Sequence, residues 1–192
     1  MGIILVYTLM MLSITMGYHR YYAHRMYESP VWLRYAFMVV GSLALVGKAC
    51  AWVAQHRAHH IHEDTERDPH SPKHKGMLYC YFLQFLSPID KRLLIFDKEV
   101  KWQHKWYWYI VASYIVLTLY FEVFLEAWLY PVLLVHCIGG LIYSYSHRSG
   151  KSHNDTWLGI ITFGEGFHNT HHTSKQLRWH KYDIGGLLIE KI

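Results

Sequence analysis

The chain has 192 residues, a length that suits a single domain, and 52% of them are hydrophobic and 17% aromatic. The formal net charge of +5 rests on few charged residues, and the basic ones form no run of the kind that binds nucleic acid. The three cysteines form no CxxC pair, which argues against a disulfide framework or a zinc site. The composition therefore favours a membrane protein with no nucleic-acid partner.

The first apolar stretch, residues 1–18, contains no charged side chain. It is long enough to cross the hydrocarbon core of a bilayer, which takes about 17–20 apolar residues in a helix. It has neither the basic start nor the small-residue cleavage site of a secretory signal, so we expect it to persist as a membrane span. The next apolar stretch, 31–53, is weaker, because Gly41, Ser42 and Gly47 interrupt it.

Two further apolar stretches, 106–121 and 127–147, flank the segment FEVFLEAWLYP. Within this segment, Glu122, Glu126 and Pro131 predict a tight reversal of the chain. We therefore expect the two stretches to form a hairpin of two membrane spans.

The distribution of basic residues predicts the topology. All 19 Lys and Arg fall in two segments, 19–105 and 148–192, and the positive-inside bias places both segments in the cytoplasm. The stretch 31–53 then stays on one side, as an interfacial or re-entrant helix, which leaves three spans and the N-terminus outside. We expect one domain over 1–192, an all-α integral membrane helical bundle with a cytoplasmic helical cap.

Histidine is the outlier of the composition, with 16 residues. HRAHH at 56–60 and HNTHH at 168–172 each place histidines at i, i+3 and i+4, positions that share one helix face. In HRYYAH, His19 and His24 are five residues apart, about 140° on an ideal α-helix, so we expect His24 where the helix ends. One such motif is often a surface cluster, but two on the same membrane face predict a metal centre. Imidazole suits iron, copper, zinc and nickel, and eight ligands are enough for a pair of ions.

The stretches TMGYHRYYAH, AQHRAHHIHEDTERDPHSP and GEGFHNTHH followed by RWHKYD resemble the membrane-bound fatty-acid desaturases. Within these enzymes they are most similar to the acyl-CoA branch, of the Δ9 or stearoyl-CoA type, from about residue 14 to the C-terminus. The resemblance implies a di-iron centre of two iron ions held by nine histidines: His19, His24, His56, His59, His60, His147, His168, His171 and His172.

The chain departs from the family pattern in two places. The family's NSxxH motif, whose asparagine holds one iron through a water, corresponds here to YSYSH at 143–147. Its asparagine is replaced by Tyr143, which could hydrogen-bond a water, ligate iron or block the site. The family also has two spans before the first histidine motif, whereas this chain has one. We expect lipid or a neighbouring subunit, in a homo-oligomer, to cover the exposed helix face.

Other residues beside the histidines are candidates for supporting roles. Metal-bound histidines usually donate their second N–H to a carboxylate or carbonyl, and four acidic residues lie close by in sequence: Glu63, Asp64, Asp68 and Glu165. A solvated acidic turn is the alternative for Glu63. Arg178, Trp179 and Asp183 match the family's RWxxxD pattern, which suggests substrate contact or packing near the site. An interfacial aromatic is the alternative for Trp179.

The resemblance implies an O2-dependent desaturase that inserts a cis double bond, at Δ9, into a long-chain acyl-CoA or acyl-lipid at the cytoplasmic face of the membrane. No HPGG segment of the cytochrome b5 kind is present, so a separate electron donor, cytochrome b5-like or ferredoxin, is implied. Two alternatives stay open. One is an acyl or alkyl hydroxylase on the same di-iron scaffold, and the other is a non-catalytic membrane metal-binding protein.

Overall fold

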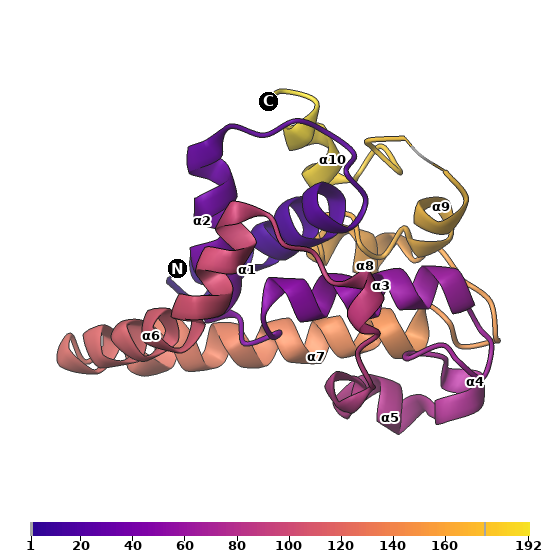
Figure 1. Cartoon of the computed structure of the whole chain (residues 1–192), viewed down its shortest axis with the longest axis horizontal. Coiled ribbons are helices and arrows are strands. Elements are labelled where there is room, and N and C mark those ends of the chain that lie inside the picture. The colour runs from indigo at the N-terminus through magenta and orange to yellow at the C-terminus, as the bar shows by residue number, and fades with distance from the viewer. Residues whose placement is uncertain (1, 175) are drawn as a thin grey trace.

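The computed structural model describes residues 2–174 and 176–192, and every regular element in them is helical, as the all-α prediction requires (Figure 1). In chain order the elements are α1 (Gly2–Leu12), η1 (Ser13–Ala23), α2 (Val31–Leu43), α3 (Ala49–His62), α4 (Pro72–Lys75), α5 (Met77–Phe82), η2 (Gln84–Leu86), η3 (Lys91–Leu93), α6 (Lys98–Tyr120), η4 (Leu125–Leu129), α7 (Tyr130–Tyr145), α8 (Thr156–Ile161), α9 (His168–Thr173) and α10 (Ile184–Ile189). Helix α7 runs along the length of the molecule, with α8 and α9 above its right-hand end and α4 and α5 below that end (Figure 1).

Two continuous helices are long and apolar enough to cross a membrane. The first, Gly2–Ala23, joins α1 and η1 over 22 residues, and the second, Leu125–Tyr145, joins η4 and α7 over 21 residues. They contain most of the predicted spans 1–18 and 127–147. The third predicted span, 106–121, lies in the C-terminal part of α6, which is not one of these two helices. The arrangement of the chain as three spans in one domain stays a prediction.

The stretch 31–53 is not the single helix that the sequence predicts. It is divided into α2 and α3 by a turn in which Leu45 and Gly47 adopt left-handed backbone angles, with φ of 55° and 98°. The buried amide of Gln103 on α6 fixes this turn from both sides. Its Oε1 accepts from the Ala49 N–H at 3.0 Å, and its Nε2 donates to Ser42 Oγ at 3.0 Å. The Ala49 N–H, at the start of α3, is thereby satisfied inside the fold.

The element η1 is a π-helix rather than a continuation of the α-helix. In a π-helix the hydrogen bonds join residues five apart, so residues at i and i+5 lie closer to one face than they would on an α-helix. The His24 N–H donates to the His19 carbonyl at 3.1 Å, and the two imidazole rings lie 4.9 Å apart. The expectation that His24 marks the helix end is confirmed, because it is the residue after Ala23 that caps η1. The helical geometry, however, keeps the two rings together, whereas an α-helix would separate them by about 140°.

Close packing brings the histidine-bearing elements together. A Cβ on Gly17 would lie 2.6 Å from Phe37 Cβ, so only glycine lets η1 approach α2 this closely. Towards the other end of the bundle, Trp128 Nε1 donates to the Leu43 carbonyl at 3.0 Å and His136 Nε2 lies 3.1 Å from the Ala44 carbonyl. These contacts attach η4 and α7 to the end of α2, so that η1, α3 and the C-terminal end of α7 converge.

Candidate metal centre

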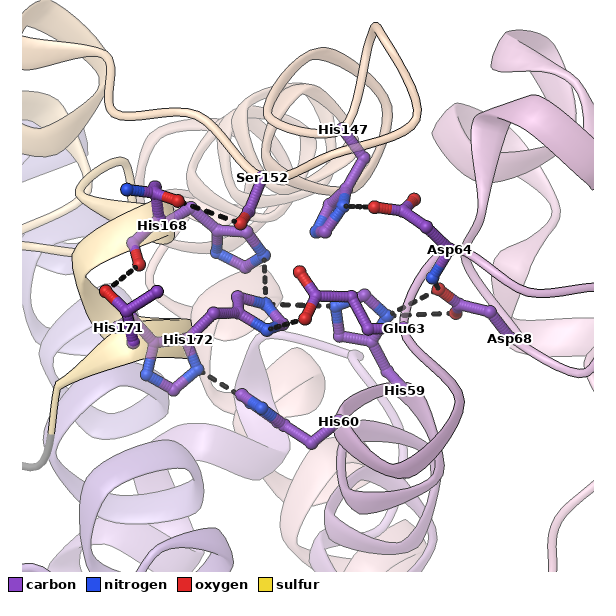
Figure 2. Close-up of polar contacts among 12 residues, drawn as sticks. His59, His60, Glu63, Asp64, Asp68, His147, Ser152, His168, His171 and His172 are labelled. Atoms are coloured by element: carbon purple, nitrogen blue, oxygen red, sulfur yellow. Dashed lines mark hydrogen bonds and ion pairs between the residues drawn. The ribbon is translucent and has the colours of Figure 1, made fainter.

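Nine imidazoles meet where four parts of the chain converge. They come from the end of η1, from α3, from the residues that follow α7, and from α9. Figure 2 shows the side chains from α3, from α9 and from the segment after α7 pointing towards one another. Their ring nitrogens fall into two sets, and within each set the nitrogens lie within 4.8 Å of one another. These nine are the residues that the resemblance predicts as ligands.

The larger set, which we call the five-histidine set, combines three parts of the chain. His19 Nε2 lies 3.0 Å from His171 Nε2, and His24 Nε2 lies 2.7 Å from His56 Nε2. The imidazole of His60 joins these pairs, with Nε2 atoms 3.0 Å from His56 and 2.8 Å from His171. Five Nε2 atoms therefore face one small volume.

The smaller set, the four-histidine set, lies beside it. His59 Nε2 is 3.2 Å from His172 Nε2, which is itself 3.1 Å from His168 Nε2. The ring of His147 completes the set, 4.8 Å from those of His59 and His168. Its Nε2 is buried and has no hydrogen-bond partner among the described residues. A buried polar atom without a partner is costly, and a metal ion at the centre of the set would satisfy it.

The environment keeps several of these imidazoles uncharged. Burial lowers the pKa of His60 to about 2, and the neighbouring imidazoles lower it in the same direction. The same two causes hold the pKa values of His56, His59 and His171 well below the usual value. A neutral imidazole offers a free lone pair, which is the form that binds a metal ion. The donor set therefore fits two ions, one in each histidine set.

Two predicted carboxylates lie directly behind the four-histidine set. His59 Nδ1 lies 2.9 and 3.0 Å from the two carboxylate oxygens of Asp68. His147 Nδ1 lies 3.2 Å from Asp64 Oδ2 (Figure 2). In both residues the Nδ1–H can donate outward to the carboxylate while the Nε2 faces inward. This is how carboxylates orient histidine ligands in metal sites.

The other two predicted carboxylates lie within ion-pair distance of other histidines. His172 Nδ1 lies 3.0 Å from Glu63 Oε2, and His19 Nδ1 lies 2.5 Å from Glu165 Oε2. Burial alone would raise the pKa of Glu165, but the neighbouring His19 and Arg20 hold it below the usual value, so this carboxylate is ionised. Each of the four acidic residues thus contacts a different histidine.

A cavity of about 560 Å³ opens beside the five-histidine set, between α3, α5, α6 and α7. Apolar and aromatic side chains form most of its wall, and His56, Trp52 and Tyr143 line it. A smaller cavity of about 50 Å³ shares these three residues and reaches Glu165 and His168. The two cavities together give an apolar ligand a route to both histidine sets.

Tyr143 approaches the four-histidine set through another imidazole. Its ring lies 4.6 Å from that of His70, which is buried and lies 5.4 Å from the ring of His59. Both Tyr143 and His70 also line the larger cavity. The tyrosine therefore stands between the cavity and the four-histidine set.

The three candidates for substrate contact lie away from both cavities. Arg178 pairs with Glu190 at 3.4 Å on the surface. Trp179 is buried, with its ring 4.6 Å from that of His171. Asp183 is fully buried and caps the first turn of α10. Trp179 and Asp183 therefore pack near the site, which is one of the two roles that the sequence suggests.

Sequence reasoning missed Arg20, which is fully buried in η1. Its guanidinium lies 2.9 Å from a carboxylate oxygen of Asp183, 3.8 Å from Glu165 Oε1, and 3.8 Å from the centre of the Trp179 ring. The signal in the sequence was a single arginine among apolar and aromatic neighbours. An arginine buried there needs a partner of opposite charge. The sequence does not say which carboxylate that partner is.

The comparisons with known proteins agree with this geometry. The family model for fatty acid desaturases matches residues 1–184. The sn-1 stearoyl-lipid 9-desaturase of Anabaena variabilis is 31% identical over 93% of this chain and 74% of its own length. Delta-9 acyl-lipid desaturase 1 of Arabidopsis thaliana is 32% identical over 97% of this chain and 69% of its own length. The sn-2 palmitoyl-lipid 9-desaturase of a Nostoc strain is 31% identical over 90% of this chain and 70% of its own length. These relatives carry acyl-lipid names, whereas the motifs resemble the acyl-CoA branch. The match over nearly the whole chain, together with the clustered histidines, means that the protein belongs to the fatty acid desaturase family.

Proposed function

We propose that this protein inserts a cis double bond, at Δ9, into a long-chain acyl group carried by a membrane lipid, with O2 as oxidant and electrons from a separate donor. Its family and its relatives make it a membrane oxidoreductase that desaturates fatty acids. The single observation that carries the finer proposal is the convergence of nine imidazoles beside an apolar cavity.

Removing hydrogen from an unactivated C–H bond is beyond acid–base side chains. A pair of iron ions, when bound, would supply the oxidising power with O2. The nine histidines would hold these ions, five at one position and four at the other. Asp68 and Asp64 orient His59 and His147 from behind by accepting their Nδ1–H groups. Glu63 and Glu165 lie against the Nδ1 atoms of His172 and His19.

The larger cavity suits the acyl chain. Its volume of about 560 Å³ lies in the range typical of ligand pockets, about 300–1,000 Å³. Because its wall is apolar and aromatic, it would exclude water from the reacting carbons. An acyl chain placed here would pass beside Tyr143 and beside His56, a member of the five-histidine set.

The acyl carrier is proposed to be a lipid for two reasons. Among the residues lining the larger cavity, the exposed ones include the large apolar side chains Phe82, Phe85 and Trp108, each more than 60% exposed. A surface of this kind is stable against the interior of a bilayer rather than water. The names of the relatives are also those of acyl-lipid desaturases. A donor such as a ferredoxin or a cytochrome b5-like protein would deliver the electrons from the cytoplasm, where the basic segments are predicted to lie.

The test is fatty-acid profiling of a desaturase-deficient host that expresses the chain, with a His171→Ala variant as the control. We expect new cis monounsaturated fatty acids with the double bond at Δ9, in the lipid fraction and not in the acyl-CoA pool at early times. New hydroxy acids would instead identify a hydroxylase on the same scaffold. An unchanged profile from a protein that retains two metal ions would refute the proposed reaction.

A further inference from the structure

The carboxylates behind the candidate metal centre are divided unequally between the two histidine sets. Three of them, Glu63, Asp64 and Asp68, contact members of the four-histidine set. One, Glu165, contacts a member of the five-histidine set. A carboxylate that accepts the Nδ1–H of an imidazole makes that imidazole a stronger electron donor to a metal ion. The two sets therefore offer different surroundings to their ions.

The three carboxylates behind the four-histidine set are not paired with a fixed cation in the described part of the chain. Within residues 2–174 and 176–192, none of them forms an ion pair with a lysine or arginine. Asp68 instead accepts backbone N–H groups, from Asp64 at 2.8 Å and from His70 at 2.8 Å, which hold it rigidly against His59. Figure 2 shows Asp64 and Asp68 on the outer side of His147 and His59, and Glu63 beside His172.

Glu165, by contrast, shares its charge with a fixed cation. Arg20 lies 3.8 Å from Glu165 Oε1, and Thr15 Oγ1 donates to the same oxygen. Arg20 cannot leave, because its Nη2 lies 3.0 and 2.9 Å from the two oxygens of Asp183 and its side chain is fully buried. In an interior of low dielectric constant, a cation at this distance attracts the carboxylate's negative charge. Glu165 therefore makes His19 a weaker electron donor than an unpaired carboxylate would.

We propose that the two metal positions are unequal, with the ion in the four-histidine set held more tightly and the ion in the five-histidine set released first. The inference rests on the proposed function, since it assumes that both sets hold a metal ion. The fifth imidazole of the larger set acts in the opposite direction. It adds only one ligand, however. Each carboxylate contact behind a ligand is typically worth 10–100-fold in metal affinity. The four-histidine set has three such carboxylates, and none of them is paired with a fixed cation among the described residues.

The test uses the purified full-length chain in detergent, stripped of metal and titrated with Co²⁺ in competition with a chelator. Co²⁺ is a suitable probe because its visible absorption differs between four-coordinate and five-coordinate ions. For the unsubstituted chain we expect two separate steps, with the ion of the four-histidine set bound at the lower free concentration. Metal analysis on the same samples gives the number of ions per chain.

Two isosteric variants assign the steps. Asp68→Asn removes the carboxylate charge behind His59, and we expect it to weaken the tighter step by about 10–100-fold and leave the other unchanged. Glu165→Gln removes the charge behind His19, and we expect it to weaken the looser step alone. Because Asp68 also organises its own turn, Glu63→Gln is a second variant at a half-exposed position that leaves the backbone contacts intact. Circular dichroism reports whether each variant keeps its helices.

The outcomes separate the inference from the function on which it rests. Two ions that bind in one step would overturn the inference and leave the two-ion site standing. The same result would follow if Asp68→Asn and Glu165→Gln weakened the same step, or if the five-coordinate signal appeared first. A chain that binds fewer than two Co²⁺ ions would overturn the proposed function as well.

Discussion

Each imidazole of the candidate metal centre uses its two ring nitrogens differently. The Nε2 atoms face inward, towards the other members of the set, and four of the Nδ1 atoms face outward to carboxylates. The outer contacts fix the rings of His59 and His147 in one orientation, since a ring flip would break the hydrogen bond to Asp68 or Asp64. The centre is therefore preorganised by contacts that no metal ion has to provide.

Loss of His171 should disable the whole centre. Its Nε2 lies close to those of His19 and His60, so it joins η1 to α3 across the five-histidine set. We expect His171→Ala to lose at least one of the two metal ions and to reduce desaturation to background. His62→Ala on α3 is the matched control, because His62 belongs to neither set. Normal turnover in His171→Ala, measured by fatty-acid profiling, would disprove the assignment of this residue as a ligand.

Tyr143 is predicted to be a tolerated replacement for asparagine. It packs against His70, and an asparagine would leave space for a water molecule beside the four-histidine set. We expect Tyr143→Asn to keep both metal ions and to desaturate as fast as the unsubstituted chain or faster. Tyr143→Phe keeps the aromatic ring and removes only the phenol oxygen, so it tests the role of the oxygen alone. If Tyr143→Asn and Tyr143→Phe both lose a metal ion, the phenol is itself a ligand.

The sequence could predict the histidines and their carboxylates but not the partner of Arg20. HRAHH, HNTHH and DTERDPH carry their spacing within a few residues, where helix geometry determines which side chains share a face. Arg20 and Asp183 are 163 positions apart, and nothing in the local pattern around either residue identifies the other. Their pairing depends on how η1 and α10 pack, which is a property of the whole fold.

At the scale of elements, the divided stretch 31–53 shows where hydrophobic patterning is insufficient. Apolar residues continue as far as Val46 and resume at Ala49, so the pattern alone favours one helix. Gly47 was the available signal for a break, since it takes a left-handed conformation that other residues adopt at a cost. The buried Gln103 that stabilises the break lies on α6, more than 50 residues later.

Helix α7 offers a direct test of the acyl cavity. Gly139 lines both cavities, and a Cβ placed there would meet no atom within 4 Å. Gly139→Leu should therefore fill the cavity without straining the helix. Replacing a glycine inside a helix stabilises the folded protein by up to about 1 kcal/mol. We expect both metal ions to remain and the products to shift towards shorter acyl chains, because each lost methylene site costs about 1–3 kcal/mol in binding.

The control for the cavity is Leu134→Phe, on an exposed part of the same helix. Fatty-acid profiling by chain length measures both variants. If Gly139→Leu produced the same chain lengths in the same amounts as the unsubstituted protein, the acyl group would have to bind elsewhere.

For the whole molecule, the predicted topology can be tested by labelling from the two sides of the membrane. Glu122 and Ser149 are exposed, and they follow α6 and α7 respectively. In a variant without the three native cysteines, Glu122→Cys should react with an impermeant thiol reagent from outside the cell. Ser149→Cys should react only after the cytoplasmic face is opened. Labelling of both from the same side would contradict the predicted hairpin and the cytoplasmic position of the centre.

Acid should destabilise the metal-free protein. Burial lowers the pKa of His60 to about 2 and holds that of His168 well below its usual value, so both are uncharged when folded. In the unfolded chain their pKa is about 6.5, so below that pH only the unfolded chain takes up protons. The free energy of unfolding then falls by up to about 1.4 kcal/mol per pH unit for each such histidine.

We therefore expect the Tm of the metal-stripped chain in detergent, followed by tryptophan fluorescence, to fall steeply between about pH 7 and about pH 5. His60→Gln removes one titrating group and should make the fall of Tm with decreasing pH less steep. A Tm that is constant over this range would show that these imidazoles are already protonated in the folded protein.

The π-helix at 13–23 has a consequence for how genes of this kind can change in length. The hydrogen bonds of the π-helix join residues five apart, and this spacing brings the rings of His19 and His24 together. One codon gained or lost between them would therefore turn an imidazole out of the centre. The segment 83–97, which contains only two short 3₁₀ turns, carries no such restriction. Insertions and deletions among related genes should accordingly accumulate in that segment and be purged from the codons for HRYYAH, and a deep alignment can test this directly.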